Sequence, residues 1–106
     1  MNTQIVENAK ELIYLDKRSN ECNERINTLV NNIPEIKDDK VLQHTLQEIE
    51  TIKEAVDSYV HRSVNLSYSL DIDYDYEWDY KKGCRTDKTD LSSIVSIVED
   101  AKKDEV

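Results

Sequence analysis

The sequence predicts a mainly α fold with a minor β part: a long antiparallel helical hairpin, a β-hairpin or strand near 63–80, and a short C-terminal helix. Three observations lead to this class. Apolar residues recur at heptad spacing in the first sixty positions, and residues 64–80 alternate strictly between apolar and polar side chains. Glycine and proline occur once each in 106 residues. Heptads are typical of packed helices, few breakers favour long helices, and a period of two indicates a strand.

The first helix is expected over about 3–32. Its apolar face follows two heptad rows, one with Ile5, Leu12, Ser19, Ile26 and Ile33 and the other with Leu15, Cys22 and Leu29. Such spacing suits a helix that packs along another helix at a shallow angle. Asn31, Asn32 and Pro34 then predict its end, because the residue before a proline disfavours helical backbone angles.

The second helix is expected over about 39–62, with Asp38 or Asp39 as the cap that accepts hydrogen bonds from its free N–H groups. Its rows are Leu42, Ile49 and Val56, and Thr45, Ile52 and Tyr59. The short connection containing proline predicts an antiparallel pair. Its end is open, since Ser63, Leu66 and Leu70 would continue the heptad. We place it near Arg62 because serine and asparagine, which recur over 63–69, are poor helix formers.

A β-hairpin is expected over about 63–80. Every even position from Val64 to Tyr80 is apolar, and opposed hairpin residues share a face, so a hairpin without a bulge requires a loop of odd length. A loop at 71–73 would pair Tyr68 with Tyr76, Leu66 with Trp78, and Val64 with Tyr80. The alternative is a strand that pairs across a dimer.

The rest of the chain is expected to complete a single domain, 1–106. Residues 81–88 place Lys81, Lys82, Arg85 and Lys88 around the single glycine, which predicts a basic turn. A last helix is expected over about 90–102, because Thr89 or Asp90 can cap it and apolar residues share one face: Leu91, Ile94, Val95 and Val98.

Charge and composition narrow the classes of function. The net charge of −9 argues against direct binding of nucleic acid or of an anionic membrane surface. No apolar run approaches the roughly 18 residues of a membrane span, and the first residues lack the pattern of a secretory signal, so a cytoplasmic location is expected. Two cysteines are too few for a disulfide framework.

The strongest candidate site is a row of acidic residues that we call the acidic line: Asp71, Asp73, Asp75, Glu77 and Asp79. On an extended chain alternate side chains repeat about every 6.6 Å, which is of the same order as successive phosphates in nucleic acid. A protein groove lined with lysine and arginine could therefore accept the line. Tyr74, Tyr76 and Trp78 are expected to anchor the contact. The plain structural alternative is a solvated polar face.

Metal and catalytic sites are not expected. Asp71, Asp73 and Asp75 match three ligand positions of a calcium loop. However, Tyr76 stands where such a loop requires glycine, and Lys82 stands where it requires its final acidic ligand. His44 and His61 have no ligand neighbours at zinc spacing, and Cys84 beside basic residues could have a lowered pKa but fits no catalytic arrangement. We therefore expect no cofactor and no enzyme activity.

Two functions follow from these features. The first is a small acidic inhibitor that mimics nucleic acid and blocks the basic groove of a nuclease, a restriction enzyme or a CRISPR effector, in the manner of small acidic proteins that phages often encode. The alternative is a coiled-coil structural or adaptor module that pairs with a partner helix or with a second copy of itself.

Overall fold

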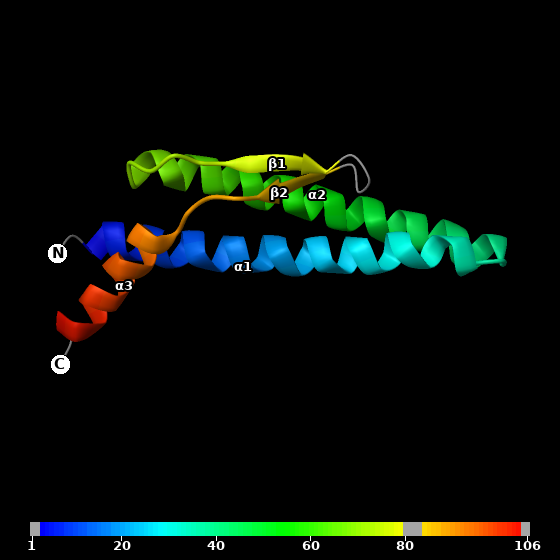
Figure 1. Cartoon of the computed structure of the whole chain (residues 1–106), viewed down its shortest axis with the longest axis horizontal. Helices are drawn as coiled ribbons and strands as arrows, with labels where there is room; N and C mark the ends of the chain where they lie inside the picture. The colour runs from blue at the N-terminus through cyan, green and yellow to red at the C-terminus, as the bar shows by residue number, and fades with distance from the viewer. Residues whose placement is uncertain (1–2, 80–83, 105–106) are drawn as a thin grey trace.

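The computed structural model describes residues 3–79 and 84–104. Its elements, in order, are α1 (Thr3–Asn32), the short 3-10 helix η1 (Ile33–Glu35), α2 (Asp39–Ser69), β1 (Tyr76–Asp79), β2 (Cys84–Asp87) and α3 (Ser92–Asp104). Figure 1 shows α1 and α2 antiparallel and side by side, the two strands along them, and α3 packed where α1 begins. The molecule measures 56 × 26 × 17 Å. The mainly α class with a long helical hairpin is confirmed.

The connection between the long helices follows the predicted signals. α1 ends at Asn32, and Pro34 lies in the first turn of η1. Asp38 then caps α2, since its Oδ1 accepts hydrogen bonds from the backbone N–H groups of Lys40 at 2.8 Å and Val41 at 3.2 Å. The cap satisfies two of the donors that a helix start leaves without intrahelical partners.

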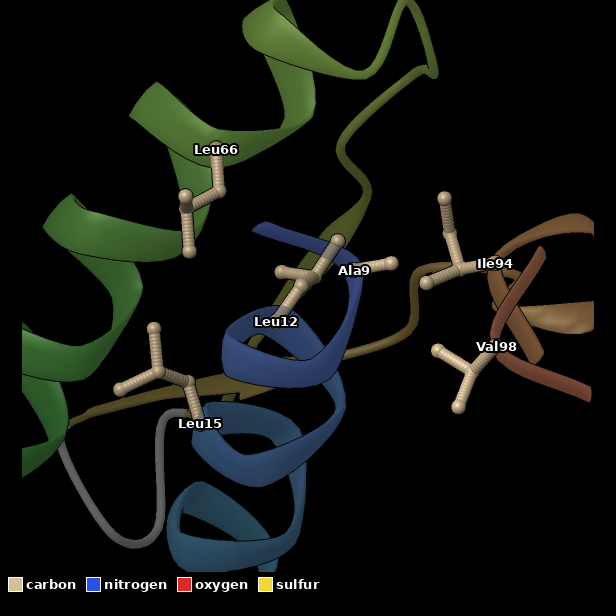
Figure 2. Close-up of a cluster of buried hydrophobic side chains, with 6 residues drawn as sticks. All are labelled: Ala9, Leu12, Leu15, Leu66, Ile94 and Val98. Carbon is tan, nitrogen blue, oxygen red and sulfur yellow. The ribbon is translucent and has the colours of Figure 1, made fainter. Parts of the chain in front are cut away.

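The core consists of two apolar clusters, one toward each end of the helix pair. The Leu12 cluster joins three helices, as Figure 2 shows, and contains Ala9, Leu12, Leu15, Leu66, Ile94 and Val98. The Ile26 cluster lies between α1 and α2 and contains Ile26, Leu29, Ile49, Val56 and Val60. Most of these residues belong to the predicted heptad rows, so the two helices use their apolar faces against each other.

The second helix is longer than predicted. α2 continues to Ser69, so the prediction of its end near Arg62 and of a hairpin that begins at residue 63 is wrong. Leu66 is buried in the Leu12 cluster. Ser63 and Ser67, which are close to it in the sequence, are also buried. The Ser67 hydroxyl donates to the carbonyl of Ser63 at 2.6 Å. This bond gives the buried hydroxyl a partner, and the packing of Leu66 outweighs the low helix propensity of serine.

α2 ends in a Schellman arrangement that begins the acidic line. The N–H of Ile72 donates to the carbonyl of Ser67 at 3.1 Å, and that of Asp71 donates to Tyr68 at 3.3 Å. Asp71 itself has φ of 56°, the left-handed conformation in which glycine is usual. Ile72 then packs against the Leu12 cluster. The turn thus directs the chain back along the helices.

The β-hairpin forms later in the chain than predicted. β1 pairs antiparallel with β2, with Tyr76 opposite Asp87 and Trp78 opposite Arg85. The predicted pairs of Tyr68 with Tyr76, Leu66 with Trp78, and Val64 with Tyr80 are therefore wrong, because residues 64–69 are helical. Since the backbone groups of β1 still need hydrogen-bond partners, another segment must supply them. Residues 84–87, predicted as part of a basic turn, supply them. Residues 80–83 lie outside the described residues.

The strands and the last helix complete the molecule. β2 contacts both α1 and α2. β1 pairs with the edge of β2 that faces away from the helices. Asp90 lies two residues before α3 begins. Its Oδ1 accepts hydrogen bonds from the backbone N–H and the hydroxyl of Ser92, the first residue of the helix, at 3.0 and 2.8 Å. These bonds favour the ionised carboxylate and lower the pKa of Asp90. Ile94 and Val98 then hold α3 on the Leu12 cluster.

Candidate protein-binding surface

The acidic line follows an extended segment that leaves the end of α2 and returns along the helices (Figure 1). Asp71, Asp73, Asp75 and Glu77 are exposed. The side chain of Asp79 lies outside the described part of the chain. Among the side chains that the structure describes, which leave out those of residues 79–87, the cation that pairs with the line is Lys88, whose Nζ lies 4.0 Å from Oε2 of Glu77. The line thus presents carboxylates that the described protein leaves largely uncompensated.

The even residues of the same segment take two kinds of environment. Ile72 and Tyr74 are half-buried, the first against the Leu12 cluster and the second against the Ile26 cluster. Tyr76 and Trp78 remain 48% and 44% exposed. Tyr74 and Tyr76 touch, with ring centroids 6.1 Å apart and planes tilted by 35°. The first half of the segment is therefore anchored by its apolar side chains, and the second half leaves aromatic surface accessible.

The backbone of the acidic line is fixed at its centre by Thr89, from the turn before α3. The Thr89 hydroxyl accepts a hydrogen bond from the N–H of Asp75 at 3.0 Å and donates to the Asp75 carbonyl at 3.1 Å. The N–H of Lys88 also donates to that carbonyl, at 2.9 Å. The sequence pattern indicates Thr89 only as a helix cap, because no local pattern links two residues fourteen positions apart.

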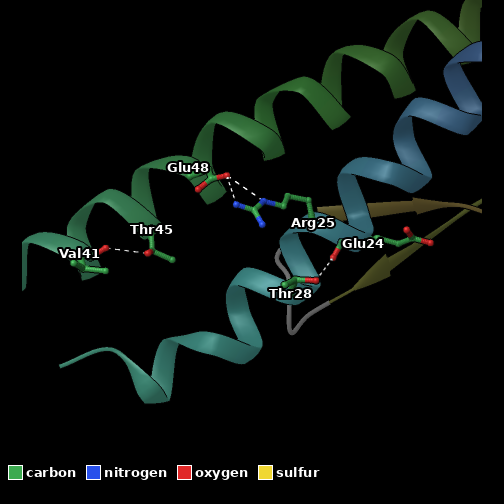
Figure 3. A network of polar contacts seen from close by, with 6 residues as sticks. All are labelled: Glu24, Arg25, Thr28, Val41, Thr45 and Glu48. Atoms are coloured by element: carbon green, nitrogen blue, oxygen red, sulfur yellow. Dashed lines mark hydrogen bonds and ion pairs between the residues drawn. The ribbon is translucent and has the colours of Figure 1, made fainter. Parts of the chain in front are cut away.

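Most cations of the two long helices are paired with carboxylates of the same two helices. Figure 3 shows the pair between Arg25 of α1 and Glu48 of α2, with 2.9 Å between Nη2 and Oε1. A second pair between helices joins Arg62 to Glu11, and it lowers the pKa of Glu11 chiefly through hydrogen bonding to the guanidinium. The described pairs within single helices are Lys10–Glu7, Arg18–Glu21 and Lys53–Glu50. These cations thus already have carboxylate partners on the helices.

A cavity lies between the last turns of α2 and the start of the acidic line. It holds about 430 Å³, and its lining includes Val64, Tyr68, Ile72, Asp73, Tyr74 and Tyr76. The sequence pattern does not indicate Tyr68 as a site residue, since the alternation places that tyrosine on a strand paired with Tyr76. Helical backbone up to Ser69 instead places Tyr68 on the outer face of α2, where it is 80% exposed.

Residues that could bind a metal do not converge in the described ranges. No group of three or more His, Cys, Asp or Glu side chains is placed there to hold an ion. Alternate acids on an extended segment point along a line, which explains why Asp71, Asp73 and Asp75 form no such group. His44 and His61 are exposed, and Cys22 is half-buried against the Ile26 cluster. The thiol of Cys84 lies outside the described residues.

None of the described helices combines the length and the apolar character needed to cross a membrane. Comparison with protein-family models, curated proteins and solved structures finds no match for this chain.

Proposed function

We propose that this protein is a small acidic inhibitor that mimics nucleic acid and blocks the basic groove of a nucleic-acid-binding protein such as a nuclease, a restriction enzyme or a CRISPR effector. The observation that supports this proposal is the position of Asp73, Asp75 and Glu77, which lie exposed along an extended backbone that other elements hold in place. A source in a phage and a cytoplasmic location belong to the same proposal.

The spacing of the carboxylates suits a surface built for phosphates. Along an extended chain the acids recur about every 6.6 Å, and a groove that holds a nucleic-acid backbone presents lysine and arginine at comparable intervals. Both surfaces release counterions when they meet, so binding weakens as the salt concentration rises. Because Thr89 fixes the centre of the line, less conformational entropy is lost on binding than for a disordered acidic tail.

The aromatic residues beside the acids add contacts that are insensitive to salt. Tyr76 and Trp78 lie on β1, the outer strand, and keep roughly half of their surface exposed. Tyrosine and tryptophan are enriched among the residues that dominate binding energies at protein interfaces. We expect them to contribute shape and affinity where the carboxylates contribute charge complementarity.

The alternative, a coiled-coil module that self-associates, remains a weaker proposal. Such a module needs heptad residues that its own fold leaves exposed, but Leu12, Ile26, Ile49 and Val56 are buried between α1 and α2. The larger exposed aliphatic side chains of α2 are Val41 and Leu46, near the helix connection. The surface that they form is small compared with the area that a stable dimer buries.

The test is capture of partners by immobilised protein from a lysate of a host cell, over a series of salt concentrations. The variant D73N/D75N/E77Q removes three charges and keeps the shapes of the side chains. We expect the wild type to capture nucleic-acid-binding proteins that excess duplex DNA or structured RNA releases, and the variant to lose them at moderate salt.

The matched control is E24Q/E54Q/D57N, which removes the same charge from exposed positions on α1 and α2. It should capture the same proteins as the wild type. Equal recovery by the acidic-line variant, or equal loss with the control, would show that the line has no specific role. Light scattering of the purified protein tests the alternative, which requires a mass that rises with concentration.

A further inference from the structure

The cavity at the start of the acidic line combines aromatic rings with a carboxylate. Tyr68, Tyr74 and Tyr76 contribute to its lining, and Asp73 lies at the same site. Tyr68, in the last turns of α2, is 80% exposed, so its ring is accessible to a ligand. Among the side chains that the structure describes, which leave out those of residues 79–87, no lysine or arginine forms an ion pair with Asp73, and this carboxylate is exposed at the edge of the cavity.

This combination attracts organic cations rather than metal ions. The face of an aromatic ring carries negative electrostatic potential, and cations placed over it are bound by about 0.5–1 kcal/mol at exposed sites. A carboxylate beside the rings adds charge and hydrogen-bond acceptors. A guanidinium uses both features best, because it is planar, stacks on rings and donates two parallel hydrogen bonds to a carboxylate.

We propose that the cavity between α2 and residues 72–76 binds an arginine side chain. Tyr68 and Tyr76 stack on the guanidinium, and Asp73 accepts its hydrogen bonds. The volume of about 430 Å³ admits the guanidinium together with its aliphatic stem, which contacts the apolar wall formed by Val64 and Ile72. The inference rests on the proposed function for the source of the arginine, namely the basic groove of the partner; the cavity's preference for guanidinium is independent of it.

The test is an NMR titration of the ¹⁵N-labelled full chain with N-acetyl-arginine amide and, separately, with N-acetyl-lysine amide. We expect saturable shifts at the amides of Ser67, Tyr68, Asp73 and Tyr74, and weaker binding of the lysine compound. Tyr68→Ala should weaken binding of the arginine compound roughly two- to fivefold, the factor that corresponds to one exposed cation–π contact.

Matched variants separate the cavity from the general charge of the line. Asp73→Asn and Asp75→Asn remove the same charge two residues apart, and only Asp73 is among the residues that line this cavity. Tyr14→Ala removes an exposed tyrosine from α1. Asp73→Asn should weaken binding and the two controls should leave it unchanged. Equal effects of Asp73→Asn and Asp75→Asn, equal affinity for both compounds, or shifts spread along the whole line would overturn the proposal.

Failure here is distinguishable from failure of the proposed function, because the titration contains no partner protein. Selective arginine binding with unchanged lysate capture by D73N/D75N/E77Q would retain the cavity and reject nucleic-acid mimicry. Loss of capture by that variant without selective arginine binding would retain mimicry and reject the cavity.

Discussion

Arg62 of α2 donates two hydrogen bonds to the carboxylate of Glu11 on α1, from Nε to Oε1 at 2.9 Å and from Nη2 to Oε2 at 3.0 Å. The two residues are fifty-one positions apart. A fork of two parallel bonds to a charged group is stronger and more directional than a single surface ion pair. It fixes the register of the two long helices beside the Leu12 cluster.

This pair predicts a dependence of stability on pH. The pKa of Glu11 is held below its ordinary value of 4.5, mainly by hydrogen bonding to Arg62. A depressed pKa in the folded state stabilises the protein above 4.5, and this contribution is lost as the pH falls through the folded-state value. We expect the urea midpoint of the wild type to fall more steeply below pH 4.5 than that of Glu11→Gln. Arg62→Gln should flatten the curve equally, and the double variant should add nothing further.

Thr89 is expected to control the order of the acidic line. Thr89→Val removes both side-chain hydrogen bonds to the backbone of Asp75 and preserves the size of the side chain. We expect a loss of about 1 kcal/mol in the free energy of unfolding and faster hydrogen exchange at the amide of Asp75. Thr89→Ser keeps the hydroxyl and should exchange like the wild type. Unchanged exchange in Thr89→Val would show that the hydroxyl does not hold the segment.

Asp71 is expected to be a site where glycine stabilises the protein. Its φ of 56° lies in the left-handed region, which costs conformational free energy for a residue with a Cβ. Glycine, which has no Cβ, adopts this conformation without that cost. The greater entropy of glycine in the unfolded chain offsets part of the gain, so Asp71→Gly should raise stability by about 0.5 kcal/mol. Asp71→Val is the contrasting variant, since a β-branched residue fits this conformation poorly. Thermal unfolding of the two variants gives the comparison, and a lower midpoint for Asp71→Gly than for the wild type would contradict the prediction.

Ile94 is expected to hold α3 on the helix pair. It is fully buried in the Leu12 cluster, whereas its neighbour Val95 is 40% exposed. Ile94→Ala removes buried methyl groups and leaves a cavity, which typically costs 2–5 kcal/mol. Val95→Ala should cost well under about 1 kcal/mol. Urea unfolding followed by circular dichroism compares them, and similar costs would mean that α3 contributes little to the core.

Neutralising the acidic line is expected to leave the fold intact. Asp73, Asp75 and Glu77 are exposed and carry like charges, so D73N/D75N/E77Q relieves repulsion. Among the described side chains, the ion pair that it breaks is the long contact from Glu77 to Lys88. We expect the free energy of unfolding to stay within about 0.5 kcal/mol of the wild type at physiological salt. A large loss would assign the acids a structural role and make the variant unsuitable as a binding probe.

Local patterns in the sequence predicted the parts of the fold that depend on neighbouring residues. The heptad rows that include Leu12 and Ile26 identify the faces of α1 and α2 that become the core, and Asp38 and Asp90 act as caps because a carboxylate can reach N–H groups two or three residues ahead. The exposed odd positions of the acidic line also follow from alternation in an extended segment.

Contacts between distant residues explain what the sequence could not predict. Residues 63–69 fit both a strand and a helix, and burial of Leu66 against α1 decides for the helix. The strand at Tyr76–Asp79 then pairs with Cys84–Asp87, whose composition resembles a polar turn. Thr89 and Tyr68 became candidate site residues only through this arrangement, because their neighbours at the site come from other elements.

The two apolar clusters draw on different lengths of the chain, and this difference sets an order of assembly during synthesis. The buried residues of the Ile26 cluster end at Val60, so they are all present once the second long helix has left the ribosome. The Leu12 cluster needs Ile94 and Val98, so its apolar surface on α1 stays accessible to chaperones and proteases until those residues emerge. A translational pause or a nonsense mutation between residues 70 and 94 would therefore expose one end of the molecule while the other is already packed.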